Sequence, residues 1–324
     1  MADGETAPRE AFIPLAVEKF QHPDLTATGE ARAAVALSSL KTLWFNTGTL
    51  CNIECINCYI ESSPKNDRLV YLTPDDVRPY FAEMDGSTFS PTEIGYTGGE
   101  PFMNPHILEL IAMGLDGDRD ALVLTNAMAP MMRPRIQEGL LKLKDAYGAK
   151  LRLRVSLDHY TQDLHEEERG PGAWAPAMAG LGWLAANGFA VEIAGRSCWG
   201  ETEETARKGY EALFTEIGLD VDAADPRALV LFPEMDERID VPEITTACWD
   251  LVGVRPEDMM CATSRMVVKR KGEAAPVVLP CTLLPYGPAF EMGPRLADAT
   301  GAVKLNHPHC AKFCVLGGGS CSAG

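Results

Sequence analysis

Short apolar runs alternate with longer amphipathic stretches between residues 42 and 232, and this alternation limits the chain to few folds. The apolar runs predict strands at 42–47, 92–97, 121–125, 151–158, 190–195 and 228–232. The stretches between them predict helices near 74–84, 105–115, 131–146, 174–187 and 202–217. Strands joined through helices pair in parallel, because a parallel neighbour requires a crossover connection. These units therefore predict an α/β fold, a partial (β/α)6 barrel rather than a closed eightfold one.

The sequence outside this alternation divides the chain into three predicted regions. Residues 1–41 lack a strong periodic pattern and are expected to form an N-terminal extension that wraps the core. Residues 42–245 form the predicted barrel, whose functional residues should gather at the C-terminal ends of its strands. Beyond residue 245 Cys, Pro and Gly dominate, so residues 246–324 predict a small region stapled by metal.

Composition excludes several classes of function. The net charge is −17, from 29 basic and 46 acidic residues, which argues against a general nucleic-acid surface. No apolar run approaches the ~18 residues of a membrane span. The N-terminus is polar and acidic, without the basic start and apolar stretch of a secretory signal. We therefore expect a cytoplasmic protein without nucleic-acid or membrane partners.

The ten cysteines are unevenly spaced. A cytosolic chain that is 46% apolar needs no disulfide staples to hold its core. Three cysteines fall within eight residues, and five more lie between residue 261 and the end. Such clusters in a reducing compartment indicate metal ligands.

The first cluster, Cys51-x3-Cys55-x2-Cys58, directly follows the first predicted strand. Three thiolates can bind three irons of a cubane, and the fourth iron stays open to a small molecule, since such clusters normally take four thiolates. A structural zinc site or three buried thiols are the alternatives. Zinc requires a fourth ligand nearby, and no His follows His22 before His106.

A second motif, YTGGEPFMNP, follows the second predicted strand. Gly98 and Gly99 allow a backbone to come close to a ligand, and the Glu100 carboxylate can accept hydrogen bonds from an ammonium group. A simple tight turn is the alternative interpretation.

A third motif, RVSLDHYTQDLHEEERGPGAW, begins on the fourth predicted strand. Ser156 and Asp158 are two residues apart, so both face one side of a strand. The Arg169 guanidinium can bind a carboxylate through two hydrogen bonds. The alternatives are a strand-end cap for Ser156 and a surface ion pair between Arg169 and the acidic residues 166–168.

In this order, the three motifs resemble those of the radical S-adenosylmethionine (SAM) superfamily over about residues 42–232. The resemblance implies that Cys51, Cys55 and Cys58 hold a [4Fe–4S] cluster that binds SAM. It also implies cofactor contacts from Gly98, Gly99, Glu100, Ser156 (ribose), Arg169 (methionine carboxylate), Asn126 and Tyr59. One departure is Asn57, where the family usually has an aromatic residue; Tyr59 follows the third cysteine instead.

The C-terminal cysteines form a second candidate site. The stretch from Cys261 to Cys281 predicts a hairpin that turns at Gly272, and hairpin ends lie close in space. The tail adds Cys310, Cys314 and Cys321. This pattern resembles the SPASM and twitch extensions, which hold auxiliary iron–sulfur clusters, although the Gly-to-Cys gap is longer and the tail has three cysteines.

From this resemblance we expect one auxiliary [4Fe–4S] cluster, ligated by Cys261, Cys281 and Cys321 together with Cys310 or Cys314. A zinc site is the alternative, because His307 and His309 are adjacent to the tail cysteines.

The resemblance implies reductive cleavage of SAM to a 5′-deoxyadenosyl radical, which abstracts hydrogen from a substrate. No catalytic acid or base is identified, and a flavodoxin- or ferredoxin-type reductant is expected. Only 41 residues precede the first predicted strand, fewer than a leader-binding domain needs, which favours oxidation or rearrangement of a small molecule over peptide or protein modification. A non-catalytic electron carrier or zinc scaffold is a third possibility, but such proteins need no ligand pocket.

Overall fold

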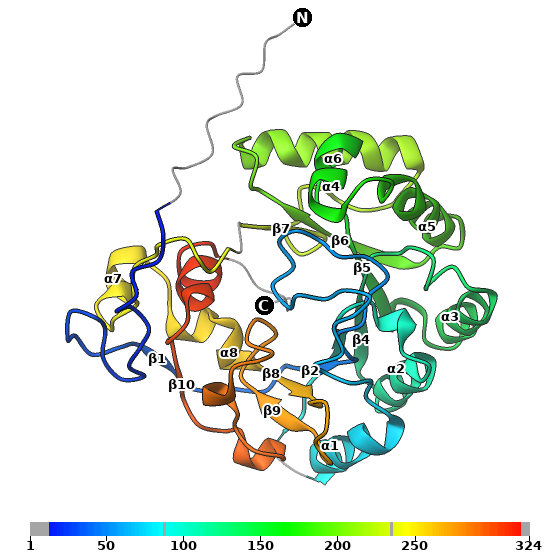
Figure 1. Ribbon diagram of the computed structural model, residues 1–324. Coiled ribbons are helices and arrows are strands. Elements are labelled where there is room, and N and C mark those ends of the chain that lie inside the picture. Colours follow the sequence, from blue (N-terminus) through cyan, green and yellow to red (C-terminus); the bar gives the residue numbers. More distant parts are fainter. Residues whose placement is uncertain (1–12, 87–88, 234–235, 319–324) are drawn as a thin grey trace, which may run out of the picture.

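The computed structural model describes residues 13–86, 89–233 and 236–318. Its main sheet has eight strands in the order β7-β6-β5-β4-β3-β2-β8-β9 (Figure 1). Neighbouring strands are parallel except for β9, which runs antiparallel to β8. The strands are β2 (Thr42–Asn46), β3 (Glu93–Thr97), β4 (Asp120–Thr125), β5 (Leu151–Ser156), β6 (Ala190–Arg196), β7 (Leu229–Phe232), β8 (Ser264–Val268) and β9 (Val277–Leu279).

The six strands predicted from the apolar runs are β2 to β7, so the predicted α/β fold with a partial barrel is confirmed. The helices that connect them lie outside the curved sheet (Figure 1). Those foreseen are α1 (Pro74–Gly86), α2 (Ile107–Asp116), α3 (Pro134–Tyr147), α5 (Trp174–Ala186) and α6 (Glu203–Ile217). Helix α4 (Gln162–Arg169) was not foreseen, because its residues QDLHEEER lack an apolar stripe.

Two apolar layers hold the sheet. The outer layer lies between the sheet and the helices, where Phe45 stacks on Phe81 and Tyr96 with ring centroids 5.7 and 6.1 Å apart. The inner layer includes Trp44, whose indole crosses the neighbouring strand at Gly95. A Cβ at Gly95 would stand 2.2 Å from that ring, so the strand needs glycine there.

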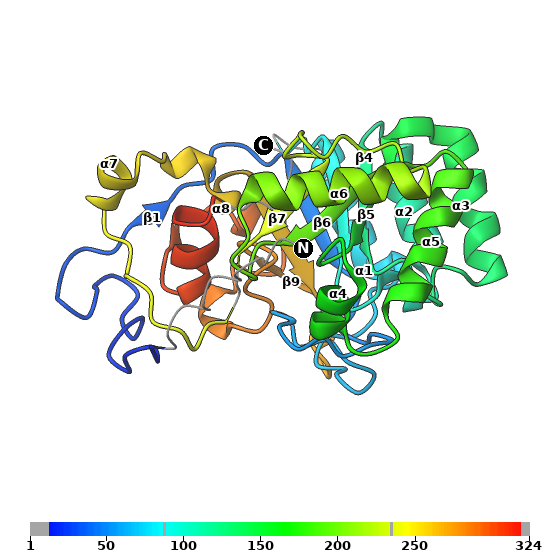
Figure 2. The same ribbon diagram turned by 90° about the horizontal axis from the view of Figure 1, so that it is seen from above.

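The C-terminal region continues the same sheet. The predicted hairpin forms β8 and β9, and β8 pairs in parallel with β2. Residues 13–40 contact this region where β1 (Ala34–Val35) pairs with β10 (Val303–Lys304). They also contact the segment after β7, where the Leu15 N–H donates to the Arg238 carbonyl at 2.7 Å. Figure 2 shows these segments as a lobe beside the helix layer.

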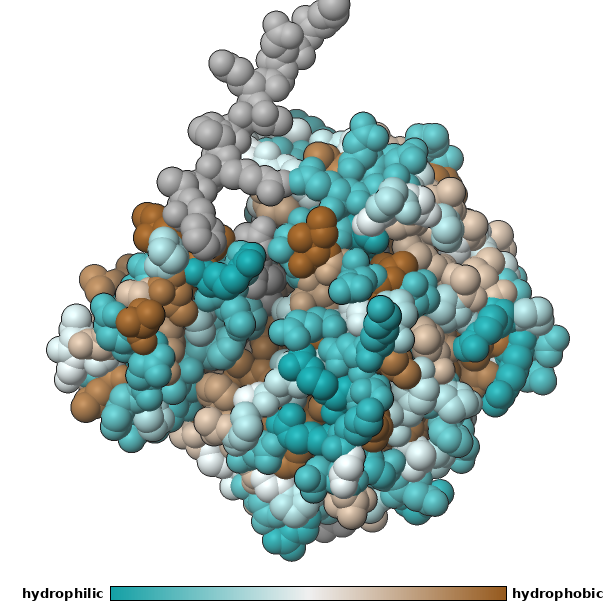
Figure 3. Space-filling view, viewed as in Figure 1, coloured by the Kyte–Doolittle hydropathy of each residue, from teal (hydrophilic) through white to brown (hydrophobic). Residues whose placement is uncertain are grey.

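The remaining elements are short. They are α7 (Cys248–Val252), α8 (Met260–Thr263), the 3-10 helices η1 (Pro101–Met103), η2 (Gly148–Lys150), η3 (Pro256–Asp258), η4 (Pro288–Phe290) and η5 (Leu296–Asp298), and the π-helix η6 (Cys310–Val315). None of the described helices combines the length and the apolar character needed to cross a membrane. The face seen in Figure 3 is mostly hydrophilic with scattered apolar residues, which is ordinary for a protein surface.

Candidate functional site

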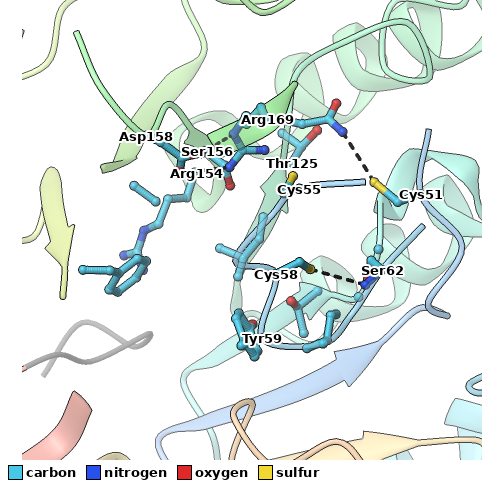
Figure 4. A pocket seen from close by; sticks show the side chains of 18 of the residues that line it. Cys51, Cys55, Cys58, Tyr59, Ser62, Thr125, Arg154, Ser156, Asp158 and Arg169 are labelled. Atoms are coloured by element: carbon cyan, nitrogen blue, oxygen red, sulfur yellow. Dashed lines mark hydrogen bonds and ion pairs between the residues drawn. The ribbon is translucent and has the colours of Figure 1, made fainter. Parts of the chain in front are cut away.

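A pocket opens at the C-terminal ends of β3 to β6 and is closed on one side by the loop that follows β2 (Figure 4). Together with its opening to solvent, its empty space measures about 1090 Å³. The residues predicted as ligands or cofactor contacts that line it are Cys51, Cys55, Cys58, Tyr59, Gly98, Gly99, Asn126, Ser156 and Arg169. The pocket therefore brings together all predicted residues of the first site except Glu100.

The three thiols of the first motif face the same pocket (Figure 4). Their loop is held by backbone bonds: the Cys51 N–H donates to the Ser63 carbonyl at 3.0 Å, and the Ile56 N–H donates to the Glu168 carbonyl at 2.9 Å. Burial raises the pKa of Cys51 to about 12. As a free thiol Cys51 would stay protonated at neutral pH, so binding a metal there must displace its proton.

These residues fit a cluster with one open iron. Among the described residues that line the pocket there is no fourth Cys and no His, and the carboxylate of Asp158 is paired with Arg169 and Arg196. A tetrahedral zinc site would need such a fourth ligand, whereas a cubane that binds SAM leaves one iron for the ligand. The donor set therefore matches three irons of a [4Fe–4S] cluster.

The glycine motif supports the cysteine loop. A Cβ at Gly99 would lie 2.2 Å from the Leu50 carbonyl oxygen, and one at Gly98 would lie 2.4 Å from the Gly48 oxygen. Two backbone bonds join the segments, from the Gly99 N–H to the Gly48 carbonyl at 2.8 Å and from the Glu100 N–H to the Leu50 carbonyl at 3.1 Å. Both glycines thus allow another backbone segment to come close. That segment is the start of the cysteine loop, at residues 48–50.

Glu100 lies behind the pocket wall and is 2% exposed. Its carboxylate accepts hydrogen bonds from the Asn126 N–H at 2.8 Å, the Thr125 hydroxyl at 2.9 Å and the Phe102 N–H at 3.1 Å. Burial raises the pKa of Glu100 to about 7, although these donors oppose the shift. In this arrangement the carboxylate connects the ends of β3 and β4.

Asp158 organises two arginines at the pocket. Its carboxylate pairs with Arg169 at 2.7 Å and with Arg196 at 3.4 Å, so the carboxylate partner recorded for Arg169 is Asp158. Burial raises the pKa of Asp158, but the two guanidinium groups outweigh it and lower the pKa below its usual value. Arg196 also donates to the Asn57 carbonyl at 2.9 Å, which connects it to the cysteine loop.

Arg154 and Arg196 also line the pocket, although neither was assigned a role from the sequence. Arg154 is 1% exposed and pairs with Glu192 at 2.6 Å. The sequence did contain a sign of their role, because Arg154 lies inside an apolar run and Arg196 directly follows one. Such runs predict buried strands, and a charged side chain on a buried strand needs a partner of opposite charge. Asn57, which stands where the family usually has an aromatic residue, donates from its amide to the Glu168 carboxylate at 2.9 and 3.0 Å.

The second site is a smaller cavity lined by four cysteines: Cys261, Cys281, Cys310 and Cys314. Burial raises the pKa of Cys261 to about 11 and that of Cys310 to about 12. The hairpin thus brings Cys261 and Cys281 to one cavity, and both Cys310 and Cys314 join them. Cys321 lies outside the described residues.

A His-Glu group lies next to this cavity. Ligand atoms of Glu237, His307 and His309 lie within 4.8 Å of one another. However, the His309 N–H donates to His307 Nδ1 at 3.2 Å, so in neutral His307 the proton is on Nε2, which faces Glu237 at 3.5 Å. A proton at Nε2 opposes a metal there, so this geometry favours a metal-free contact between His307 and Glu237 over a zinc site.

One layer of side chains separates the first cavity from the second. Leu283 lines both cavities. Phe313 lines the first cavity and belongs to the apolar cluster that contains Cys281, with Cys314 packed against it. A molecule in the first pocket would therefore lie between the two sites.

Residues 45–198 match the sequence model of the radical SAM superfamily. The antilisterial bacteriocin subtilosin biosynthesis protein AlbA of Bacillus subtilis strain 168 is 30% identical over 145 residues, which cover 44% of this chain and 30% of AlbA. The mycofactocin maturase MftC of Mycobacterium ulcerans strain Agy99 is 26% identical over 178 residues, which cover 55% of this chain and 42% of MftC. The chain thus matches less than half the length of either relative.

Solved structures share the fold. SuiB of Streptococcus suis bound to S-adenosylmethionine aligns with a TM-score of 0.57 and 12% identity, over 79% of this chain and 63% of SuiB. Native anSMEcpe with bound AdoMet aligns with a TM-score of 0.54 and 13% identity, over 78% of this chain and 77% of that protein.

Proposed function

Because residues 45–198 match the radical SAM superfamily, we propose that this chain is an enzyme that modifies a peptide or protein substrate by radical chemistry. The observation that carries the proposal is the set of three thiols on one loop that face a pocket lined by the other two motifs. A non-catalytic electron carrier would have no use for such a pocket.

Cys51, Cys55 and Cys58 would hold the [4Fe–4S] cluster at which SAM binds. Once bound, this pair of cofactors supplies a 5′-deoxyadenosyl radical that abstracts a hydrogen atom from the substrate. The protein contributes orientation and a site that excludes water. Arg169 uses Nε and Nη2 for Asp158, which leaves Nη1 for the methionine carboxylate of SAM.

The remaining cofactor contacts follow from position in the pocket. Ser156 ends β5 beside Arg169 and would contact the ribose. Asn126 and Tyr59 line the same cavity and would contact the rest of SAM. Glu100 would act indirectly, because its carboxylate holds the Asn126 backbone at 2.8 Å.

A peptide substrate is favoured by the names of the relatives. One is a bacteriocin biosynthesis protein and another a maturase. SuiB has also been solved bound to its precursor peptide SuiA, with a TM-score of 0.54 to this chain. The expectation of a small-molecule substrate rested only on the number of residues before the first strand, which is 41. These relatives favour the alternative, which is modification of a peptide or protein.

We further propose an auxiliary [4Fe–4S] cluster ligated by Cys261, Cys281, Cys310 and Cys314. The support is that all four thiols line one cavity, one side-chain layer from the first pocket. This cluster would accept an electron from the substrate or anchor it.

The test uses anaerobically reconstituted protein with dithionite, SAM and synthetic peptides encoded by short reading frames next to the gene. We expect 5′-deoxyadenosine, and a peptide that loses the mass of two hydrogens if the net reaction is an oxidation or a crosslink. Cys198→Ala is the matched control, because Cys198 lines neither cavity. Intact cubane absorbance without any 5′-deoxyadenosine would refute the enzyme, and turnover of a small molecule with every peptide unchanged would refute the peptide assignment.

A further inference from the structure

Arg265 is a buried cation on β8. It is 1% exposed, and its guanidinium donates hydrogen bonds only to backbone carbonyls in the contacts that the structure records. Nη1 donates to the carbonyls of Cys261 and Ser264 at 2.7 Å each, and Nε donates to the carbonyl of Ala299 at 2.8 Å. A weaker contact of 3.4 Å joins Nη2 to the Gly301 carbonyl.

The other deeply buried arginines all have a carboxylate partner. Arg32 pairs with Glu243 at 2.5 Å and Arg154 with Glu192 at 2.6 Å, while Arg169 and Arg196 share Asp158. Among the described residues, no carboxylate oxygen lies within 4.0 Å of Arg265. Carbonyl dipoles satisfy its N–H groups but do not neutralise its charge, and an uncompensated buried charge is costly.

The second cysteine site could supply an anionic partner. Burial lowers the pKa of Arg265, and the thiols of Cys261 and Cys281, which both line that cavity, oppose this shift. The bond from Nη1 to the Cys261 carbonyl also fixes the guanidinium against the backbone of a proposed ligand. A cluster held by four thiolates carries net negative charge, whereas four neutral thiols would leave Arg265 uncompensated.

We propose that Arg265 is the counter-charge of the metal centre at Cys261, Cys281, Cys310 and Cys314, and that it raises the reduction potential of that centre. The inference rests on the proposed auxiliary cluster. When the cluster takes up one electron, its negative charge grows by one, and the fixed positive charge of Arg265 stabilises the reduced form. Arg265 is not among the residues that line either cavity, so it acts as a positioning and tuning residue.

The experiment isolates the second cluster in a Cys51/Cys55/Cys58→Ala background and measures its midpoint potential by dithionite titration followed by EPR. Arg265→Gln removes the charge, whereas Arg265→Lys keeps the charge and loses most of the carbonyl bonds. We expect Arg265→Gln to lower the equilibrium constant for one-electron uptake at least tenfold, which is 59 mV more negative. Arg265→Lys should stay close to the parent.

Arg270→Met is the matched control, since Arg270 lies just beyond β8, pairs with Glu291 at 2.6 Å and is 23% exposed. It should leave the potential unchanged. A potential in Arg265→Gln equal to that of the control overturns the inference and makes Arg265 a structural staple. An equal shift in Arg265→Lys and Arg265→Gln overturns it too, because hydrogen bonds then matter and charge does not.

Two further outcomes are informative. If Arg265→Gln loses its iron while Arg265→Lys retains it, the charge is needed to hold the centre at all, which supports the inference. If the background variant with intact Arg265 binds zinc or no metal, the auxiliary cluster itself is refuted. That failure is separate from a failure of Arg265, because it appears before Arg265 is changed.

Discussion

The two cysteine sites are built in opposite ways. Cys51, Cys55 and Cys58 come from one loop of eight residues, whereas the four thiols of the second cavity come from α8, the end of the hairpin and η6. Cysteines on one short loop are brought together by the loop itself and by the residues that contact it. The second site exists only after the hairpin has joined β2 and the tail has packed against it. The first should therefore respond to changes in its loop, and the second to changes in the whole fold.

The largest expected effect tests this division directly. Cys55→Ala should abolish formation of 5′-deoxyadenosine with dithionite and no substrate, because two thiolates on a short loop cannot retain the cubane. Cys281→Ala should leave this uncoupled cleavage largely intact while turnover of the true substrate is lost. Anaerobic chromatography for 5′-deoxyadenosine measures both, with Cys198→Ala as control. Equal loss in Cys55→Ala and Cys281→Ala would mean that the sites are not independent.

The iron content of the protein also compares the two cysteine sites, because each site is expected to hold one cubane. Reconstituted wild type should carry about eight irons from two cubanes, and a Cys51/Cys55/Cys58→Ala variant about four. The expectation follows from three thiols in one pocket and four in the other. Iron and zinc are measured together by plasma mass spectrometry. A triple variant without iron that still holds zinc would contradict the auxiliary cluster.

A next effect concerns the support of the first loop. Gly99→Ala places a Cβ 2.2 Å from the Leu50 oxygen, where only backbone could yield, and should cost about 1–3 kcal/mol or more. We expect loss of iron from the first site with retention at the second. Gly182→Ala is the matched control, because nothing lies within 4 Å of its Cβ position in helix α5. It should be neutral or stabilising by about 0.5–1 kcal/mol. Full iron content in Gly99→Ala would show that the loop tolerates a shift.

Removing one cofactor contact should have a smaller effect. Arg169→Ala should weaken SAM binding about ten- to a hundredfold, or ~1.5–3 kcal/mol, while both clusters survive. Asp158 would keep Arg196 as its partner, at 3.4 Å. Anaerobic calorimetry measures the affinity, and Arg227→Ala is the control, since Arg227 is exposed and pairs only with Asp225 in the described contacts. Unchanged affinity in Arg169→Ala would place the methionine carboxylate elsewhere.

The smallest effect is a pH slope. Burial raises the pKa of Glu100 to about 7 from 4.5, so the folded state binds this proton more tightly than the unfolded state. The tighter proton binding by Glu100 therefore adds to the free energy of unfolding. This stabilisation is fully present below about pH 4.5 and is lost as the pH rises through 7. Its slope is at most about 1.4 kcal/mol per pH unit. In Glu100→Gln the slope over this range should flatten in urea unfolding curves, and identical slopes would show that Glu100 is ionised throughout.

Much of the fold followed from local sequence. The six apolar runs correspond to β2 to β7, because a buried parallel strand needs a short apolar run whatever surrounds it. The three cysteines of the first loop were expected to lie together because they fall within eight residues, and all three line one pocket. Helix α4 was not foreseen, because QDLHEEER lacks the apolar stripe on which the prediction depended. Yet α4 supplies Glu168, which binds Asn57 and so positions the cysteine loop.

Only the tertiary structure decided which charges are buried and what compensates them. Arg154 and Arg196 read as ordinary basic residues in the sequence, and their carboxylate partners lie on other segments of the chain. That Arg265 is buried and bonded to backbone carbonyls was equally invisible in the sequence. Likewise, the choice between Cys310 and Cys314 could not be made from spacing, and the structure brings both to the cavity. The physical reason is that strand and loop propensities act over a few neighbouring residues. Charge compensation and ligand convergence depend on segments that meet only after folding.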